Sequence, residues 1–198
     1  MHELLRQLKV SAIVIIVFAV VLCGVYPVVV WVLGQVLFPF QSNGSLITDA
    51  TGQVVGSAII GQQFAGPQYF EPRPSYAGNG YDATLSGGSN LGPTSQKLAT
   101  NIQTAVAEYR KENKLPVGAP VPADAVTGSA SGLDPHISIA NAQLQALRVA
   151  KARKTTLANV QALIGQHTDG RSLGIFGEPG VNVLTLNIAL DAMYPMKK

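Results

Sequence analysis

The feature that most constrains this chain is an uninterrupted apolar run near its N-terminus. Residues 10–33 read VSAIVIIVFAVVLCGVYPVVVWVL, and Ser11 is their only clearly polar member. About 20 consecutive apolar residues let a helix cross the hydrocarbon core of a bilayer. A cleaved signal peptide would have a shorter apolar region, about 7–15 residues, followed by a small-residue cleavage site, which is absent here. The sequence therefore predicts a transmembrane helix over residues 10–33, with Pro27 kinking or ending it near its outer end.

The charges that flank this run predict its orientation. Arg6 and Lys9 precede it, whereas the other side has no Lys or Arg until Arg73. Short cytoplasmic segments beside a span are enriched in Lys and Arg, and long domains are translocated largely regardless of their charge. We therefore expect residues 1–9 in the cytoplasm, a juxtamembrane connector over residues 34–44 and an extracytoplasmic domain over residues 45–198.

Charge and cysteine content exclude several functions for the predicted outer domain. The formal net charge of the chain is only +3, whereas a nucleic-acid-binding domain is typically strongly basic. The only cysteine is Cys23, inside the predicted span, so the outer domain has neither a disulfide nor a reactive thiol. Its length is sufficient to bury a hydrophobic core without such cross-links.

The outer domain begins with β patterns and continues with an irregular stretch. Residues 45–61 contain two short β runs around a turn at Asp49–Gly52. Residues 64–93 are rich in Gly, Pro, Ser, Asn and Tyr, which predicts a long irregular segment. Such a segment is uncommon in a compact domain unless it binds something or is held by a partner.

Helical periodicity dominates the rest of the domain. The first helix, within residues 93–114, is expected to begin at a Thr94 or Ser95 cap and to bury one face, made by Leu98, Ile102, Ala105 and Tyr109. A second helix over residues 138–154 is expected to bury Ala140, Leu144, Leu147 and Ala150. A third starts at a Thr156 cap. The last, within residues 181–195, is apolar on several sides and is predicted to pack centrally or against another subunit. We predict an α/β (α+β) domain with a small sheet and about four helices.

Motifs for phosphoryl transfer and nucleophilic hydrolysis are incomplete. The nearest match to a P-loop, Gly165–Ser172, has Arg171 in place of the lysine and follows a predicted helix instead of a strand. The pattern G-x-S-x-G is absent, because GSASG puts Ala130 at the nucleophile position. We therefore expect no catalytic residues in this chain.

A glycine-rich stretch, LSGGSN, holds the clearest candidates for contact with a nucleotide or a partner. They are Ser86, Gly87, Gly88, Ser89 and Asn90. Consecutive glycines let backbone N–H groups converge on an anion, and the serine and asparagine side chains add donors. The alternative is a tight loop before a helix, with glycines chosen because they accept a positive φ. On these residues alone the sequence favours the loop.

Three further residues are candidates for partner contact. Arg73 lies between two prolines in YFEPRPS and could pair with a carboxylate of a partner or of this chain. Asp134 and His136 lie in GLDPHIS, and His167 and Asp169 could complete a metal site with them. The spacing across a proline does not suit a standard zinc pattern, and Asp-Pro is typical of a turn. We therefore predict no bound metal.

Several phrases, taken in order, give the chain a specific resemblance. They are GVYP at the end of the span, then NGSLI, GSAIIGQQF, YFEPRPS, SGGSNLGP, VPADAVTGSASGLDPHIS, RVAKAR and VNVLTLNIALD. In this order the chain resembles the C subunit of the Kdp-type high-affinity potassium-transporting ATPase of bacteria, over nearly its whole length.

The resemblance implies a membrane complex that imports potassium at the expense of ATP. The implied partners are a channel-like potassium-binding subunit, a P-type ATPase catalytic subunit, a very small hydrophobic subunit and membrane lipid. It implies a single-pass protein of the bacterial cell (inner) membrane that is needed for assembly and raises the ATP affinity of the catalytic subunit in a chaperone-like way. ATP and potassium are used by the complex, and no covalently bound cofactor is implied. The D-K-T-G-T phosphorylation motif expected of the pump subunit is missing, which fits a non-catalytic role.

Two points remain open at this stage. The family's glycine-rich motif, proposed to help bind nucleotide, falls on residues 86–90, but the predicted topology places those residues away from cytoplasmic ATP. Two other functions are also compatible with a membrane-anchored outer domain. One is a hydrolase using Asp134 and His136, and the other is a module that senses a ligand or an ion.

Overall fold

The chain divides into two units, residues 1–46 and 47–198, which are described separately. They come from a computed structural model that describes residues 1–49 and 51–196. Ala50, within the predicted Asp49–Gly52 turn, and the last two residues of the predicted 45–198 domain lie outside the described residues.

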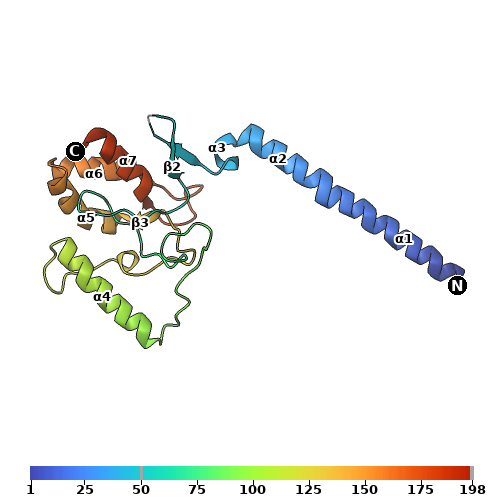
Figure 1. The fold of residues 1–198 in the computed structure, drawn as a ribbon, viewed down its shortest axis with the longest axis horizontal. Coiled ribbons are helices and arrows are strands. Elements are labelled where there is room, and N and C mark those ends of the chain that lie inside the picture. The colour runs from blue at the N-terminus through green and yellow to red at the C-terminus, as the bar shows by residue number, and fades with distance from the viewer. Residues whose placement is uncertain (50, 197–198) are drawn as a thin grey trace. The chain divides into compact units, whose positions relative to one another are not determined.

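The N-terminal unit is dominated by one helical segment of 36 residues that is apolar and long enough to cross a membrane. It comprises α1 (His2–Ala19), a π-helical stretch (Val20–Val25) and α2 (Tyr26–Leu37), and Figure 1 shows them as one continuous rod. Of the two effects expected of Pro27, a kink or an end of the helix, the second is excluded, since α2 continues for ten residues beyond it. The π-helical stretch lies directly before Pro27, which has no backbone N–H to give to the preceding turn.

The connector that follows is more helical than the sequence indicated. Within the predicted connector, residues 34–44, the helix α2 continues to Leu37, and a short helix α3 (Pro39–Ser42) comes next. The amide of Asn43 donates to the Gln35 side chain and to the carbonyl of Pro39, so the two helices are joined by side-chain contacts.

The second unit contains two small antiparallel sheets. The strands β1 (Leu46–Thr48) and β2 (Val54–Ser57) form the first, on either side of the predicted turn. The second has the order β3-β5-β4, with β5 (Gly180–Asn182) between β3 (His136–Ser138) and β4 (Thr168–Asp169). Segments that are far apart in the chain therefore meet in one sheet.

Among residues 47–49 and 51–196, four α-helices complete this unit, in agreement with the prediction of about four. They are α4 (Gln96–Glu112), α5 (Ile139–Ala152), α6 (Leu157–Gln166) and α7 (Val183–Met193), with a 3-10 turn at Ala123–Ala125. In Figure 1 α5, α6 and α7 lie together around the three-stranded sheet, and α4 lies to one side. The predicted caps Ser95 and Thr156 are confirmed, because each side chain accepts a hydrogen bond from a backbone N–H three residues on.

The buried faces of the helices agree with the sequence except in α5. Of the expected face of α4, Tyr109 is buried and Leu98, Ile102 and Ala105 are half-buried. The buried residues of α7 are Val183, Leu184, Leu186, Asn187 and Leu190, and those of α6 are Val160, Leu163 and Ile164. In α5 the expected face is only partly right, because Ala150 is buried and Leu144 half-buried, whereas Ala140 is exposed and Leu147 is 47% exposed. The face that is buried instead carries Ala142, Ala146 and Val149 beside the polar residues Asn141 and Gln145.

The irregular segment predicted at residues 64–93 is confirmed, since it contains neither helix nor strand. It is nevertheless anchored in the core, where Phe70 is completely buried against residues of α5, α6 and α7. Asn187 of α7 binds both backbone groups of Phe70, accepting from its N–H at 2.9 Å and donating to its carbonyl at 2.9 Å. A side-chain amide thus takes the place of a neighbouring strand for this part of the segment.

Candidate functional site

The glycine-rich stretch, residues 86–90, packs against a second loop of the same domain. The backbone N–H of Gly87 donates to the Ser131 carbonyl at 2.9 Å, and the Ser86 hydroxyl donates to the same carbonyl at 3.0 Å. A Cβ added at Gly88 would lie 3.1 Å from the carbonyl oxygen of Ala130. One N–H group of the proposed anion cradle is therefore already bonded to protein.

The reason for the two glycines differs from the one expected. Neither Gly87 nor Gly88 has a positive φ, and the residue of the stretch that does is Asn90, at φ 51°. Position 88 favours glycine because a side chain there would press against the backbone of Ala130. The expectation of a tight loop is therefore compatible with the geometry, but the expectation of positive φ at the glycines was wrong.

The three candidates for partner contact form a connected chain of charges. Arg73 donates to Asp134 at 3.1 Å and also reaches the carbonyls of Thr127 and Gly128. The Asp134 carboxylate accepts from the His136 backbone N–H at 2.9 Å and lies 3.6 Å from its Nδ1. On the other side of the ring, His136 Nε2 is 2.7 Å from Asp169. The folded chain thus brings together Arg73, Asp134, His136 and Asp169.

Strand pairing explains why residues 33 positions apart meet here. Both β3, which begins at His136, and β4, which ends at Asp169, pair with β5. A Cβ added at Gly180 of β5 would lie 3.1 Å from the Cβ of His136, so the glycine leaves room for the ring. The fourth metal candidate, His167, lies outside this cluster of charged side chains, because its Nδ1 is 3.1 Å from the Thr185 hydroxyl.

The electrostatics of the cluster favour a protonated His136. Asp134 is the main group that raises the pKa of His136, burial opposes the rise, and Asp169 adds to it. Burial alone would raise the pKa of Asp134, but His136 and Arg73 more than compensate and lower it. Burial lowers the pKa of His167.

This arrangement gives the hydrolase hypothesis no support. Both ring nitrogens of His136 face carboxylates, at 3.6 Å and 2.7 Å, so neither is free to accept a proton from a hydroxyl nucleophile. Among the described residues there is also no group of three or more His, Cys, Asp or Glu side chains that could hold a metal ion.

We expect the His136–Asp169 pair to make a small, pH-dependent contribution to stability. Because the pKa of His136 is raised above its value of 6.5 in an unfolded chain, the contribution is fully present below that pH and is lost as pH rises through the folded value. Replacing Asp169 by Asn should therefore cost about 0.5 kcal/mol at pH 6 and less at pH 9, since the carboxylate is largely exposed.

Urea denaturation of the full-length chain in detergent micelles, at both pH values, measures this difference. Asp169 also acts to raise the pKa of His167, so its replacement removes a favourable interaction with both protonated histidines, and both losses are larger at pH 6 than at pH 9. An equal loss at pH 6 and pH 9 would contradict the assignment.

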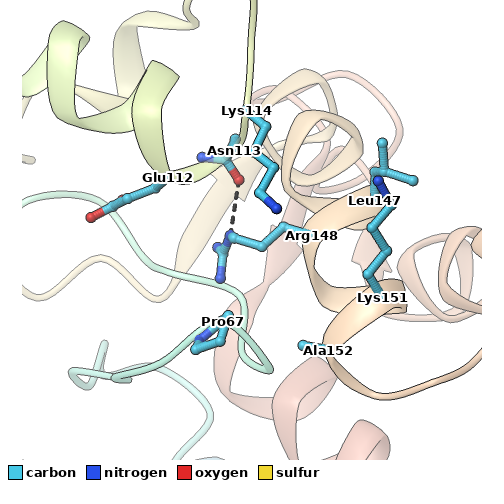
Figure 2. A pocket seen from close by; sticks show the side chains of 8 residues that line it. All are labelled: Pro67, Glu112, Asn113, Lys114, Leu147, Arg148, Lys151 and Ala152. Carbon is cyan, nitrogen blue, oxygen red and sulfur yellow. Dashed lines mark hydrogen bonds between the residues drawn. The ribbon is translucent and has the colours of Figure 1, made fainter.

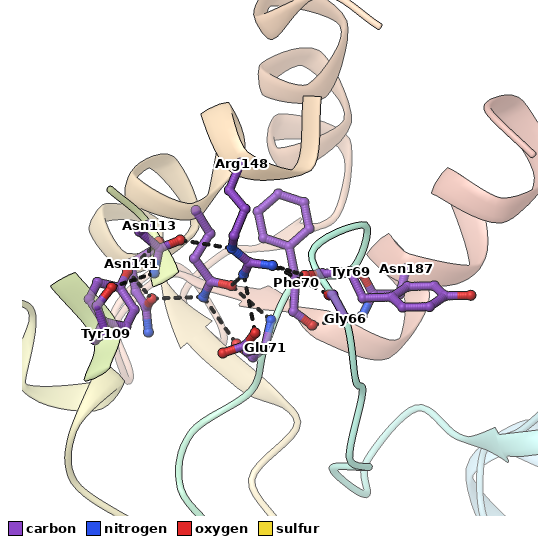
Figure 3. Close-up of polar contacts among 10 residues, drawn as sticks. Gly66, Tyr69, Phe70, Glu71, Tyr109, Asn113, Asn141, Arg148 and Asn187 are labelled. Carbon is purple, nitrogen blue, oxygen red and sulfur yellow. Dashed lines mark hydrogen bonds and ion pairs between the residues drawn. The ribbon is translucent and has the colours of Figure 1, made fainter. Parts of the chain in front are cut away.

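A larger polar network, which the sequence did not indicate, holds the irregular segment to the helices (Figure 3). Arg148 of α5 is its centre, with a side chain only 8% exposed. Its guanidinium donates to Asn113 at 3.0 Å, to the Tyr69 carbonyl at 3.0 Å and to Gln145 at 2.8 Å, and lies 3.6 Å from the Glu71 carboxylate. Every arm of the guanidinium therefore has a partner from a different part of the fold.

The network continues from Arg148 along α5. Gln145 accepts from the Glu71 N–H at 2.8 Å and donates to the Glu71 carbonyl at 3.1 Å. Its amide also donates to Asn141, which accepts from the Tyr109 hydroxyl at 2.8 Å. Burial raises the pKa of Glu71, the nearby Glu112 carboxyl adds to the rise, and Arg148 opposes it.

Arg153 makes the second attachment of the irregular segment. Its side chain is completely buried and donates to the Gln68 carbonyl, the Tyr194 carbonyl and Asp191 at 2.8–3.0 Å. Its guanidinium carbon also lies 4.9 Å from the centre of the Tyr69 ring, a cation–π distance. The two arginines of RVAKAR, Arg148 and Arg153, thus hold the irregular segment to α5.

A pocket of about 320 Å³ lies beside this network, between the end of α4, α5 and the irregular segment. Figure 2 shows its lining, which consists of Pro67, Glu112, Asn113, Lys114, Leu147, Arg148, Lys151 and Ala152. The N–H groups of Arg148 are already bonded to Asn113, Tyr69 and Gln145. The cations that the pocket could offer to an anion are therefore mainly Lys114 and Lys151. A second pocket of about 520 Å³ adjoins the His136 cluster and is lined in part by Ser172, Phe176 and Glu178.

Comparison with known proteins covers nearly the whole chain. The family described as "K+-transporting ATPase, c chain" (KdpC) matches residues 8–192. Proteins named potassium-transporting ATPase KdpC subunit are similar over most of their own length. Those of Mycobacterium tuberculosis and Mycobacterium bovis are 55% identical over 188 residues, 95% of this chain and 99% of theirs. The Caulobacter vibrioides protein is 52% identical over 97% of this chain and 96% of its own, and that of Koribacter versatilis is 48% identical over 96% and 97%.

Proposed function

The chain belongs to the family of the K+-transporting ATPase c chain, KdpC. From that premise we propose that it is a non-catalytic subunit that assembles and stabilises an ATP-driven potassium-import complex. Its relatives are named as subunits of a potassium-transporting ATPase, and their similarity spans both the apolar helix and the outer domain. This full-length identity is the observation that carries the proposal. The channel-like subunit, the catalytic P-type subunit, the small hydrophobic subunit and lipid are the proposed partners.

The folded domain supports a role without chemistry of its own. Its most connected side chains, Arg148 and Arg153, bind backbone carbonyls and carboxylates of the same domain. The His136 ring lies between two carboxylates. We therefore propose that this domain acts by presenting a rigid surface to the other subunits, held at the membrane by one helix.

The proposed topology defines how such a subunit can influence ATP binding. With residues 1–9 in the cytoplasm, residues 47–196 lie outside it, and the stretch 86–90 contacts protein instead of nucleotide. An increase in the ATP affinity of the catalytic subunit is then a coupling free energy carried through the other subunits. Ser86–Asn90, Arg73, Asp134 and His136 are proposed to shape the surface that those subunits meet.

Reconstitution of the complex with and without this chain tests the proposal. We expect the other subunits to show little potassium-stimulated ATPase activity without it, and the full chain to restore that activity. A version ending at Leu46, which keeps the apolar helix, should not restore it if the outer domain is required. Full potassium-stimulated activity of the other subunits alone would contradict the proposal, as would ATP hydrolysis by this chain in isolation.

A further inference from the structure

A hairpin between β4 and β5 exposes three large apolar side chains that the domain does not use. This apolar hairpin, residues 171–178, carries Leu173, Ile175 and Phe176, which are 89%, 68% and 61% exposed. The residues of the hydrophobic core, in contrast, are at most 8% exposed. Since burial is what makes such side chains stabilise a fold, these three contribute little to the stability of the domain. A grouped and exposed apolar surface of this kind is typical of an interaction site.

The hairpin is held in one conformation by its own hydrogen bonds. Ser172 and Phe176 exchange two backbone bonds, at 2.9 Å and 3.0 Å, and the Gly174 N–H donates to the Arg171 carbonyl. At its base Arg171 donates to both oxygens of Glu178 at 2.8 Å. The two ends continue into strands of the three-stranded sheet. An apolar tip that is already ordered loses little conformational entropy when it binds.

The backbone conformation at the tip of the hairpin supports a binding role for the exposed apolar side chains. Leu173 has φ 54°, in the left-handed region that a branched side chain rarely adopts, and Gly174 follows at φ 77°. This conformation costs free energy in the folded domain and keeps the leucine side chain in solvent. Strained residues of this type gather at binding surfaces, where the shape of the loop is used.

The charges of the hairpin favour a protein partner over a lipid surface. Binding at a membrane surface is strengthened by Lys and Arg around the apolar face. Here the single cation, Arg171, is neutralised by Glu178, and Asp169 is the next charged residue on the β4 side. A neutral, rigid knob of leucine, isoleucine and phenylalanine is suited to a shaped apolar groove.

We propose that the apolar hairpin, residues 171–178, docks into an apolar groove on the extracytoplasmic face of another subunit of the potassium-transporting complex. This inference rests on the proposed function, because the partner is a subunit of the same assembly. Leu173 and Phe176 are the side chains expected to enter the groove, and the Arg171–Glu178 pair forms the polar rim around them.

Cysteine labelling in nanodiscs, where both faces of the bilayer are accessible, tests the contact. In a Cys23→Ala background, which removes the native thiol, Phe176→Cys is labelled with a soluble maleimide in the chain alone and in the assembled complex. We expect labelling to be about tenfold slower in the complex, corresponding to a stable contact. Val117→Cys is the control, because Val117 is fully exposed and should react equally in both.

Each other outcome overturns the inference in a recognisable way. Equal labelling of Phe176→Cys in both samples, with the complex intact, removes the hairpin contact but leaves the proposed function standing. Slow labelling already in the chain alone means that lipid or a second copy of this chain covers the tip. Absence of this chain from the purified complex would overturn the proposed function and the contact together.

A pair of double variants gives a second readout. Leu173→Ser with Phe176→Ser should weaken retention of the chain on the complex about tenfold or more, whereas Leu85→Ser with Val117→Ser should not. All four parent side chains are at least 60% exposed, so both proteins are expected to fold. Equal retention of the two variants would contradict a special role for the hairpin.

Discussion

Replacing Arg148 by methionine is expected to lower the free energy of unfolding by about 3 kcal/mol, because it leaves buried acceptors without a partner. The Tyr69 carbonyl and the Asn113 side chain lose the Arg148 donor, and the Gln145 side chain loses one of its two donors. The Glu71 carboxylate loses its nearest cation. Methionine keeps a similar length of side chain, so the loss reports on the hydrogen bonds more than on packing. Urea denaturation of the full-length chain in micelles, followed by circular dichroism, measures it.

Lys151→Met on the same helix is the matched control. Lys151 is exposed, and its replacement should change the free energy of unfolding by no more than about 0.5 kcal/mol. If the two variants were equally stable, the network in Figure 3 would not be what holds residues 66–71 to the helices.

Gly132→Ala is expected to be the other strongly destabilising change, with a loss of about 3 kcal/mol. Gly132 has φ +68°, and an added Cβ would lie 2.5 Å from the Gly87 carbonyl oxygen and 2.8 Å from the Ala77 nitrogen. Both of these neighbours are backbone atoms that cannot move away cheaply. The variant should therefore separate the glycine-rich stretch from the loop that supports it.

Gly87→Ala tests whether this effect is specific to position. An added Cβ at Gly87 meets nothing within 4 Å, and its φ is not positive, so stability should stay within about 0.5 kcal/mol of the parent protein. Thermal unfolding of both variants in the same micelles gives the comparison. A large loss for Gly87→Ala, or none for Gly132→Ala, would contradict the packing described for this stretch.

The features that the sequence predicted correctly are those determined by residues close together in the chain. The Ser95 and Thr156 caps follow from one side chain binding the first turn of its own helix. The apolar helix follows from length and composition, and the irregular segment from its glycines and prolines. The inward face of α4, where Tyr109 is buried and Leu98, Ile102 and Ala105 are half-buried, follows from an apolar spacing of three and four residues.

The polar face of α5 illustrates what the sequence could not give. Asn141, Gln145 and Arg148 lie four and three residues apart, a helical stripe that an apolar pattern search does not select. Their burial depends on backbone groups of residues 66–71, which have no strand to pair with. A stripe of amides and arginine facing a predicted irregular segment is the signal that could have indicated this arrangement.

The cluster around His136 was predictable only in part. Arg73, Asp134 and His136 were each proposed as partner contacts, but nothing in their spacing predicts that they bind one another. Asp169 joins them through the pairing of β3 and β4 with β5, which is set by contacts between distant segments. His167, two residues before Asp169, binds Thr185 instead.

The most direct test of the account is the side of the membrane on which the folded domain lies. In intact cells that produce Val117→Cys in the Cys23→Ala background, a maleimide that does not cross membranes should label the chain, because Val117 is fully exposed and proposed to be extracytoplasmic. Labelling that appears only in inverted vesicles, with none in intact cells, would contradict the account. The domain would then lie beside cytoplasmic ATP, and the glycine-rich stretch would have to be considered as a nucleotide contact.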